Sequence, residues 1–270
     1  MSKDIRQLGA SEVALRLISK LRDAKKEKRA NICRTFLTRY PELLLIQNLG
    51  SLILNRIERH EGFTPFLQRF EKKIIIRKQE IAKNASDIFH NDTVLTLSRS
   101  STVLEAFAHS SERIREVIVL ESRPAFEGRS MARSIAEMRI EVKIIVDSAV
   151  GYFIDKVDSV VIGADAILPE GAVVNKIGSY PLALLSNRTN TPFFVLSSLF
   201  KADIQQIGVK VEQRDPKEIW KDAPNNITPL NIYFERVPFS LVSGIYCELG
   251  EISPSKFVDT AVQYIKEQEP

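Results

Sequence analysis

The chain has 270 residues, of which 44% are hydrophobic and 27% are charged, and its formal net charge is +4. This size allows one large domain plus a smaller one, and the composition is that of an ordinary soluble protein without the roughly 20 apolar residues needed to span a bilayer. Two distant cysteines and no signal-peptide pattern exclude a disulfide framework and a cysteine-rich zinc site and indicate a cytoplasmic protein.

The first 88 residues predict a helical domain. Apolar residues recur at helical spacing from Ser11 to about Ala30, and Ser11 is a suitable cap for this helix. Further helical stretches are expected at about 32–38, 41–57 and 65–83.

This helical half is basic. Residues 1–90 contain 19 Lys and Arg against 10 Asp and Glu, whereas residues 91–270 contain 19 against 24. A basic surface can attract nucleic acid, but acidic residues interleave the basic runs and no aromatic stacking motif accompanies them. We therefore expect solvated helix faces and no direct binding of nucleic acid.

After Asn91 the pattern changes to short strands that alternate with helices. Strands are predicted at 93–97, 117–121, 142–146, 159–163 and 192–196, and helices at 101–108, 130–137 and 180–187. This alternation predicts a parallel sheet covered on both faces, within an α/β domain over residues 89–270. Two more strand-like runs at 232–235 and 244–246 and a helix at 254–268 complete it.

Polar residues follow the predicted strands. Asp165 comes at the carboxyl end of an apolar run, and Asn175 and Lys176 then open a Gly/Ser turn. Because ligands of open parallel sheets bind beyond the carboxyl ends of the strands, these residues predict a site for a small anionic ligand. The alternative is a buried Asp that caps a helix.

The turn after the first predicted strand is rich in hydroxyl groups. Arg99, Ser100 and Ser101 follow Ser98 and enter a helix, whose free N–H groups and dipole favour a phosphate. The alternative is an ordinary helix cap with spare serines. Arg123 and Lys201 follow two other strands, so they are expected at the same edge.

Five segments resemble a known family. They are Thr96–Leu104, Glu121–Pro124, Val146–Tyr152, Gly163-Ala164-Asp165 and Asn175-Lys176-Ile177-Gly178-Ser179. In this order they resemble the initiation factor 2B alpha/beta/delta family, which also contains ribose-1,5-bisphosphate isomerase and 5-methylthioribose-1-phosphate isomerase. The resemblance implies a helical domain followed by a Rossmann-like domain, and a homodimer or higher assembly.

The resemblance also implies roles for particular residues. The isomerases use a Cys after the first strand of the large domain and the Asp of Gly-Ala-Asp, which puts Ser98 and Asp165 at the catalytic positions. A hydroxyl is a much poorer acid than a thiol, so Ser98 puts isomerase chemistry in doubt. The residues that match phosphate or substrate contacts are Gly9, Ala10, Arg123, Asn175, Lys176 and Lys201.

Two functions stay open. The first is a protein related to the initiation factor 2B alpha subunit that binds a sugar phosphate or nucleoside monophosphate and contacts translation-factor subunits; the missing thiol favours it. The second is an aldose-phosphate to ketose-phosphate isomerase, which the retained Asp165 favours. No cofactor is expected, since neither a Walker sequence nor Gly-x-Gly-x-x-Gly is present, and the three histidines lack the spacing of a metal site.

Overall fold

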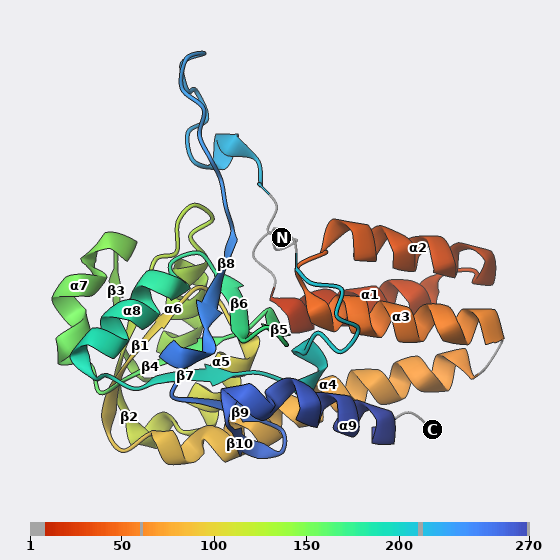
Figure 1. The fold of residues 1–270 in the computed structure, drawn as a ribbon, viewed down its shortest axis with the longest axis horizontal. Coiled ribbons are helices and arrows are strands. Elements are labelled where there is room, and N and C mark those ends of the chain that lie inside the picture. The colour runs from red at the N-terminus through yellow and green to blue at the C-terminus, as the bar shows by residue number, and fades with distance from the viewer. Residues whose placement is uncertain (1–8, 60–61, 210–212, 269–270) are drawn as a thin grey trace.

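A helical part precedes a mostly parallel sheet in the computed structural model, which describes residues 9–59, 62–209 and 213–268 (Figure 1). The helical part consists of α1 (Ala10–Asp23), α2 (Lys26–Arg39), α3 (Leu44–Arg59) and α4 (Phe63–Asn84). Their apolar sides bury one shared core. The last helix, α9 (Phe257–Gln268), links the two parts, because its Phe257 packs in the core of the sheet and its Ile265 in that of the helices.

The helix predicted from Ser11 to about Ala30 ends earlier, at Asp23, and the second helix, predicted at about 32–38, begins at Lys26. The helical conformation is interrupted at Ala24 and Lys25, whose backbones are extended, and α2 then continues to Arg39. The reversal lets Leu21 of α1 and Phe36 of α2 bury in the same core. The break contains no Gly or Pro. Its residues, Ala24 and Lys25, both favour a helix, so the sequence does not signal the break.

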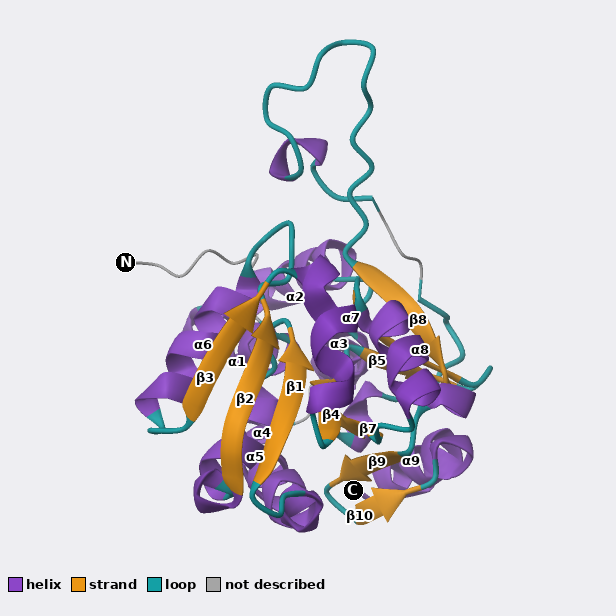
Figure 2. Ribbon diagram, turned by 90° about the vertical axis from the view of Figure 1, so that its left-hand side faces the viewer, coloured by secondary structure: helices purple, strands orange, loops and turns teal. Residues whose placement is uncertain are grey.

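The large sheet has the strand order β10-β9-β7-β4-β1-β2-β3, and all neighbours are parallel except β10 and β9 (Figure 2). Its strands are β1 (Asp92–Leu97), β2 (Ile114–Leu120), β3 (Glu141–Ile145), β4 (Ser159–Gly163), β7 (Phe193–Leu196), β9 (Gly244–Cys247) and β10 (Gly250–Ile252). The crossover helices are α5 (Ser101–His109), α6 (Glu127–Glu137), α7 (Val150–Phe153) and α8 (Ser179–Thr189).

Both faces of this sheet are buried, as the apolar strands predict. Successive strand residues point to opposite faces. Val94 therefore packs with α5 and α6, whereas Leu95 packs with α8 and α9. The strands end together at one edge, and this edge carries the candidate site.

A second sheet was not predicted. It consists of β5 (Ala166–Leu168), β6 (Ala172–Lys176) and β8 (Phe234–Pro238), which pair antiparallel. Asn175 and Lys176 thus end a strand and do not open a turn. All residues of β5 and β6 are buried, so the alternation that announces an antiparallel strand is missing.

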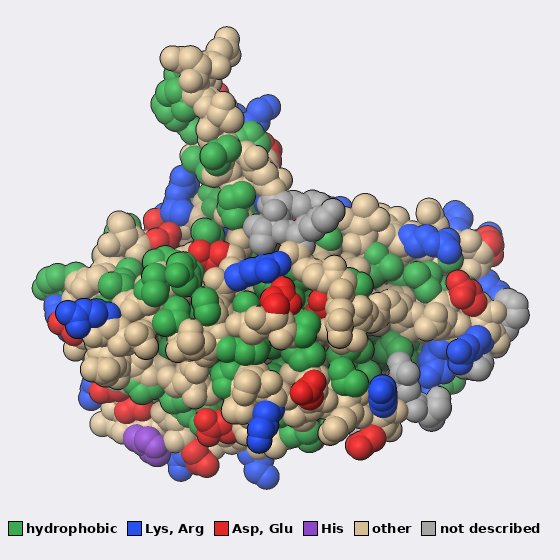
Figure 3. All heavy atoms as spheres, in the orientation of Figure 1, with side chains coloured by type: hydrophobic (Ala, Val, Ile, Leu, Met, Phe, Trp, Pro, Cys, Tyr) green, Lys and Arg blue, Asp and Glu red, His purple; other side chains and the backbone are tan. Residues whose placement is uncertain are grey.

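An arm formed by residues 213–233 projects from the body between β7 and β8 (Figure 3). Its two sides are joined by a bridge between Gln213 and Ile232. Trp220 and Leu230 of the arm are 48% and 68% exposed. Within the described residues, no helix combines the length and hydropathy needed to cross a membrane.

Candidate functional site

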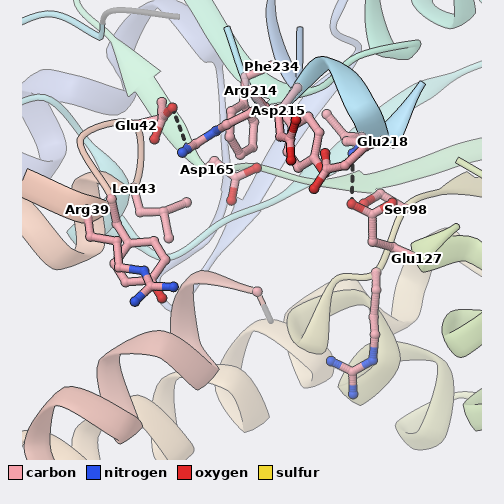
Figure 4. Close-up of a pocket in the computed structure, with 15 residues that line it drawn as sticks. Arg39, Glu42, Leu43, Ser98, Glu127, Asp165, Arg214, Asp215, Glu218 and Phe234 are labelled. Atoms are coloured by element: carbon pink, nitrogen blue, oxygen red, sulfur yellow. Dashed lines mark hydrogen bonds and ion pairs between the residues drawn. The ribbon is translucent and has the colours of Figure 1, made fainter. Parts of the chain in front are cut away.

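A cavity of about 290 Å³ opens at the carboxyl ends of the parallel strands, bounded by the helical part and the base of the arm (Figure 4). Ser98 after β1 and Asp165 after β4 line it, together with Lys176 of β6. A chamber of about 30 Å³ adjoins the cavity and shares Gly9, Ser98, Arg99 and Asp165 with it. Three segments distant in sequence therefore bring their polar groups to one space.

The chamber lies at the N-termini of two helices. Gly9 precedes the first residue of α1, and Ser100 caps α5 by accepting a hydrogen bond from the Val103 N–H at 3.3 Å. Gly9, Ala10, Ser100 and Ser101 all line the chamber. The Gly9 N–H donates to the Glu12 Oε2 at 3.1 Å, so one N–H group at the start of α1 is already paired. The dipoles of both helices still favour negative charge, so two helix starts beside one chamber suit an anion such as phosphate.

Gly163 allows Ser100 to approach the end of β4. A Cβ atom at position 163 would lie 2.5 Å from the Ser100 Oγ and 2.9 Å from its Cβ. Any larger residue would therefore displace the cap of α5. The Gly of the Gly-Ala-Asp segment thus shapes the chamber, while the Asp lines it.

Lys201 is the buried cation of the chamber. Its side chain follows β7, is 5% exposed and donates from Nζ to the Ala164 carbonyl at 2.6 Å. Burial lowers the pKa of Lys201, and the Asp165 carboxylate acts in the opposite direction. Arg99 also lines the chamber, where its guanidinium lies 2.6 Å from Glu12 Oε2.

Lys176 lies on the other side of the shared space. Its Nζ is 2.7 Å from Glu127 Oε1 and 3.8 Å from the centre of the Tyr233 ring. Glu127 lines the cavity, and its second oxygen, Oε2, is buried without a hydrogen-bond partner among the described residues. That oxygen can accept a hydrogen bond from a ligand.

Asp165 lies where the cavity meets the chamber. In Figure 4 its side chain points into the cavity, with the paired Glu42 and Arg214 on one side and Glu218 on the other. Burial raises the pKa of Asp165 to about 6, and Lys201 and Lys176 limit the rise. A carboxyl group that titrates near neutrality can both give and take a proton, which suits general acid–base chemistry.

Ser98 has a left-handed backbone, with φ at +59°. Its N–H donates to the Ser122 Oγ at 2.6 Å, which fixes the turn after β1. Among the described residues that line the two spaces there is no cysteine. Burial raises the pKa of Cys33 to about 11 and that of Cys247 to about 12, so neither provides a thiolate near neutral pH.

Most of the acidic lining was not predicted from the sequence. Glu42 precedes α3 and lies 2.6 Å from Arg214, while Glu218 accepts hydrogen bonds from Tyr233 and Asn231 at the base of the arm. A third unpredicted acid, Glu127, lines the cavity from the start of α6. Tertiary packing brings these acids from the helical part, the arm and α6 to one cavity.

Two expectations for the anion site are not met. Arg123 lies outside the lining of both spaces; it is exposed and donates to the Ile219 carbonyl at 3.2 Å. The Gly/Ser turn after Lys176 holds a carboxylate of its own chain, because Glu235 accepts from the N–H groups of Gly178 and Tyr180 at 2.6 and 2.9 Å. The start of α8 is therefore occupied.

Asn175 lines the chamber, and its Nδ2 donates to the Ser179 Oγ at 2.9 Å.

In the described part of the chain, no group of three or more His, Cys, Asp or Glu side chains could hold a metal ion.

Comparisons with known proteins point to one family. The model of the initiation factor 2 subunit family matches residues 58–254. The ribose 1,5-bisphosphate isomerase of Archaeoglobus fulgidus is 38% identical over 172 residues, which cover 60% of this chain and only 54% of that protein. The isomerase of the same name from Methanocaldococcus jannaschii is 28% identical over 254 residues, covering 90% of this chain and 82% of that protein.

The fold also matches a solved structure. The translation initiation factor eIF-2B of Pyrococcus horikoshii superposes with a TM-score of 0.77 at 27% identity, covering 92% of this chain and 91% of that one.

Proposed function

Because the chain belongs to the initiation factor 2 subunit family, we propose that it binds a small phosphorylated ligand, a sugar phosphate or a nucleoside monophosphate, without full isomerase chemistry. The observation that carries this proposal is the chamber, where two helix N-termini meet the buried Lys201. Such a site attracts a phosphate group and, being concave and partly enclosed, excludes water from it.

The rest of the ligand would extend into the larger cavity. Glu127 and Glu218 line that space, and ionised carboxylates accept hydrogen bonds from sugar hydroxyl groups. The Tyr233 ring next to Lys176 supplies an apolar wall. A ligand with a phosphate at one end and several hydroxyl groups beyond it matches this division of charge.

Isothermal titration calorimetry with ribose 1,5-bisphosphate and with adenosine monophosphate tests binding. Wild-type protein should release or absorb heat with at least one of them. Lys201→Met should weaken the binding at least tenfold, because the buried ammonium is lost from the chamber. Lys156→Met, which removes an exposed lysine outside both linings, is the control. No heat with either ligand would reject these two as ligands.

Isomerase activity is the second candidate, and one observation favours it. Asp165, with a pKa near 6, lies at the junction of the two spaces, where the first two carbons of a phosphorylated aldose would lie. Ser98 would replace the thiol that the family resemblance implies. Incubation with ribose 1,5-bisphosphate should then yield the ketose, and Asp165→Asn should abolish the product. Binding without turnover would leave the first function.

We also propose that the chain forms a homodimer or higher oligomer in the cytoplasm and contacts translation-factor subunits. The exposed apolar side chains of the arm, Trp220 and Leu230 among them, support an association with protein. Light scattering during gel filtration measures the mass directly. A monomer at micromolar concentration would contradict the oligomer.

A further inference from the structure

Helix α3 contacts the backbone beside both Asp165 and Lys201. Leu44, its first residue, donates its N–H to the Asp165 carbonyl at 3.3 Å. One turn later, the Asn48 Nδ2 donates to the carbonyls of Phe200 and Ala202 at 2.9 and 3.0 Å. Residues four apart share a helix face, so one face of α3 holds both segments of the site.

The two carbonyls that Asn48 binds lie on either side of Lys201. Asn48 is 3% exposed, so both N–H bonds of its amide are used inside the protein and not in solvent. In the same turn, the buried Glu248 accepts from the Ser198 hydroxyl and the Leu199 N–H at 2.9 and 3.0 Å. The turn that carries Lys201 is therefore fixed by hydrogen bonds to Asn48 of α3 and to Glu248, which follows β9.

We propose that Asn48 is a positioning residue: its amide clamps the Phe200–Ala202 backbone so that the Lys201 ammonium stays beside Asp165 and the chamber. The effect on a ligand rests on the proposed function. The clamp itself is a property of the ligand-free protein and can be measured without a ligand.

The charges around Asp165 make the clamp measurable. Lys201 and Lys176 favour its ionised form, while Glu42 and Glu127 oppose it. The other charged groups that line the shared spaces are Arg39, Arg99, Arg214, Asp215 and Glu218. When Lys201 moves away, Asp165 loses the strongest of the charges that stabilise its carboxylate, so its titration midpoint must rise.

The experiment follows the carboxyl carbon of Asp165 by NMR in ligand-free protein with ¹³C-labelled aspartate, using Asp165→Asn to assign the signal. Asn48→Leu should raise the midpoint by roughly one pH unit. Lys201→Met should raise it as much, and adding Asn48→Leu to Lys201→Met should give no further rise. Gln47→Leu is the matched control, since this neighbouring amide also donates to two carbonyls, those of Leu37 and Tyr40, both at 3.0 Å.

An unmoved midpoint in folded Asn48→Leu protein would overturn the proposal, as would equal rises in the Gln47 and Asn48 variants. If Asn48→Leu does not fold, Asn48→Ser, which keeps one donor, should give a smaller rise in the same direction. Where ribose 1,5-bisphosphate binds, Asn48→Leu should weaken it about tenfold. Failure of calorimetry with wild-type protein counts against the ligand, whereas failure of the titration shift counts against the clamp.

Discussion

The buried carboxyl group of Asp165 should make the protein less stable as the pH rises. Its pKa is about 6 in the folded chain, against about 4 for an aspartate in an unfolded chain. Between these two values the unfolded state loses its proton first, so the folded state binds more protons. The free energy of unfolding therefore falls as pH rises from about 4 to above 6, and the shift of about two pH units corresponds to about 3 kcal/mol.

Asp165→Asn isolates this effect, because an amide does not titrate. Urea unfolding at intervals between pH 4 and pH 7 should show the stability of wild-type protein falling, relative to the variant, by about 3 kcal/mol. The comparison is needed because burial also raises the pKa of Glu235 and Glu248. Asp155→Asn, at an exposed position, should follow the wild-type curve. A difference between wild type and Asp165→Asn that stays constant with pH would refute the buried, near-neutral carboxyl.

Three other predictions follow from single substitutions, one of them with a matched control. Gly163→Ala should lower stability by about 1–3 kcal/mol and weaken phosphate binding in calorimetry, since its Cβ would press on Ser100; unchanged values in both measurements would contradict the tight approach. Arg77→Met should cost about 3–5 kcal/mol in urea unfolding because it removes the cation paired with the buried Glu248, while Arg113→Met, which breaks an exposed pair, should cost under about 1 kcal/mol. Similar losses for both would refute the importance of burial here. Ser98→Cys should increase conversion of ribose 1,5-bisphosphate to the ketose if a thiol is what the site lacks, and equal rates in the two proteins would argue against that role.

Most of the fold could be predicted from the sequence. The helical stretches and the strands β1, β4 and β7 were found because apolar residues recur with the period of each element. The break between α1 and α2 was predicted about six residues too late, and the strands β5 and β6 were missed. The former has no turn residue to mark it, and the latter are buried on all sides and lack alternation.

The candidate site could be predicted only where it is built from strand ends. Ser98, Asp165 and Lys201 lie within five residues of the carboxyl ends of β1, β4 and β7, so the topology of a parallel sheet brings them together. Glu42 and Asn48 could not be found in this way, because they reach the site through the packing of α3 against distant segments. Glu235 lies at the start of α8 because β8 pairs antiparallel with β6. The sequence pattern did not predict this pairing.

A crystal structure of the protein grown with ribose 1,5-bisphosphate tests the central claim most directly. The account predicts electron density for one phosphate in the chamber, between the starts of α1 and α5 and near Lys201, with the sugar extending past Asp165 towards Glu127. A phosphate bound outside the chamber that Ser98, Asp165 and Lys201 line would contradict it.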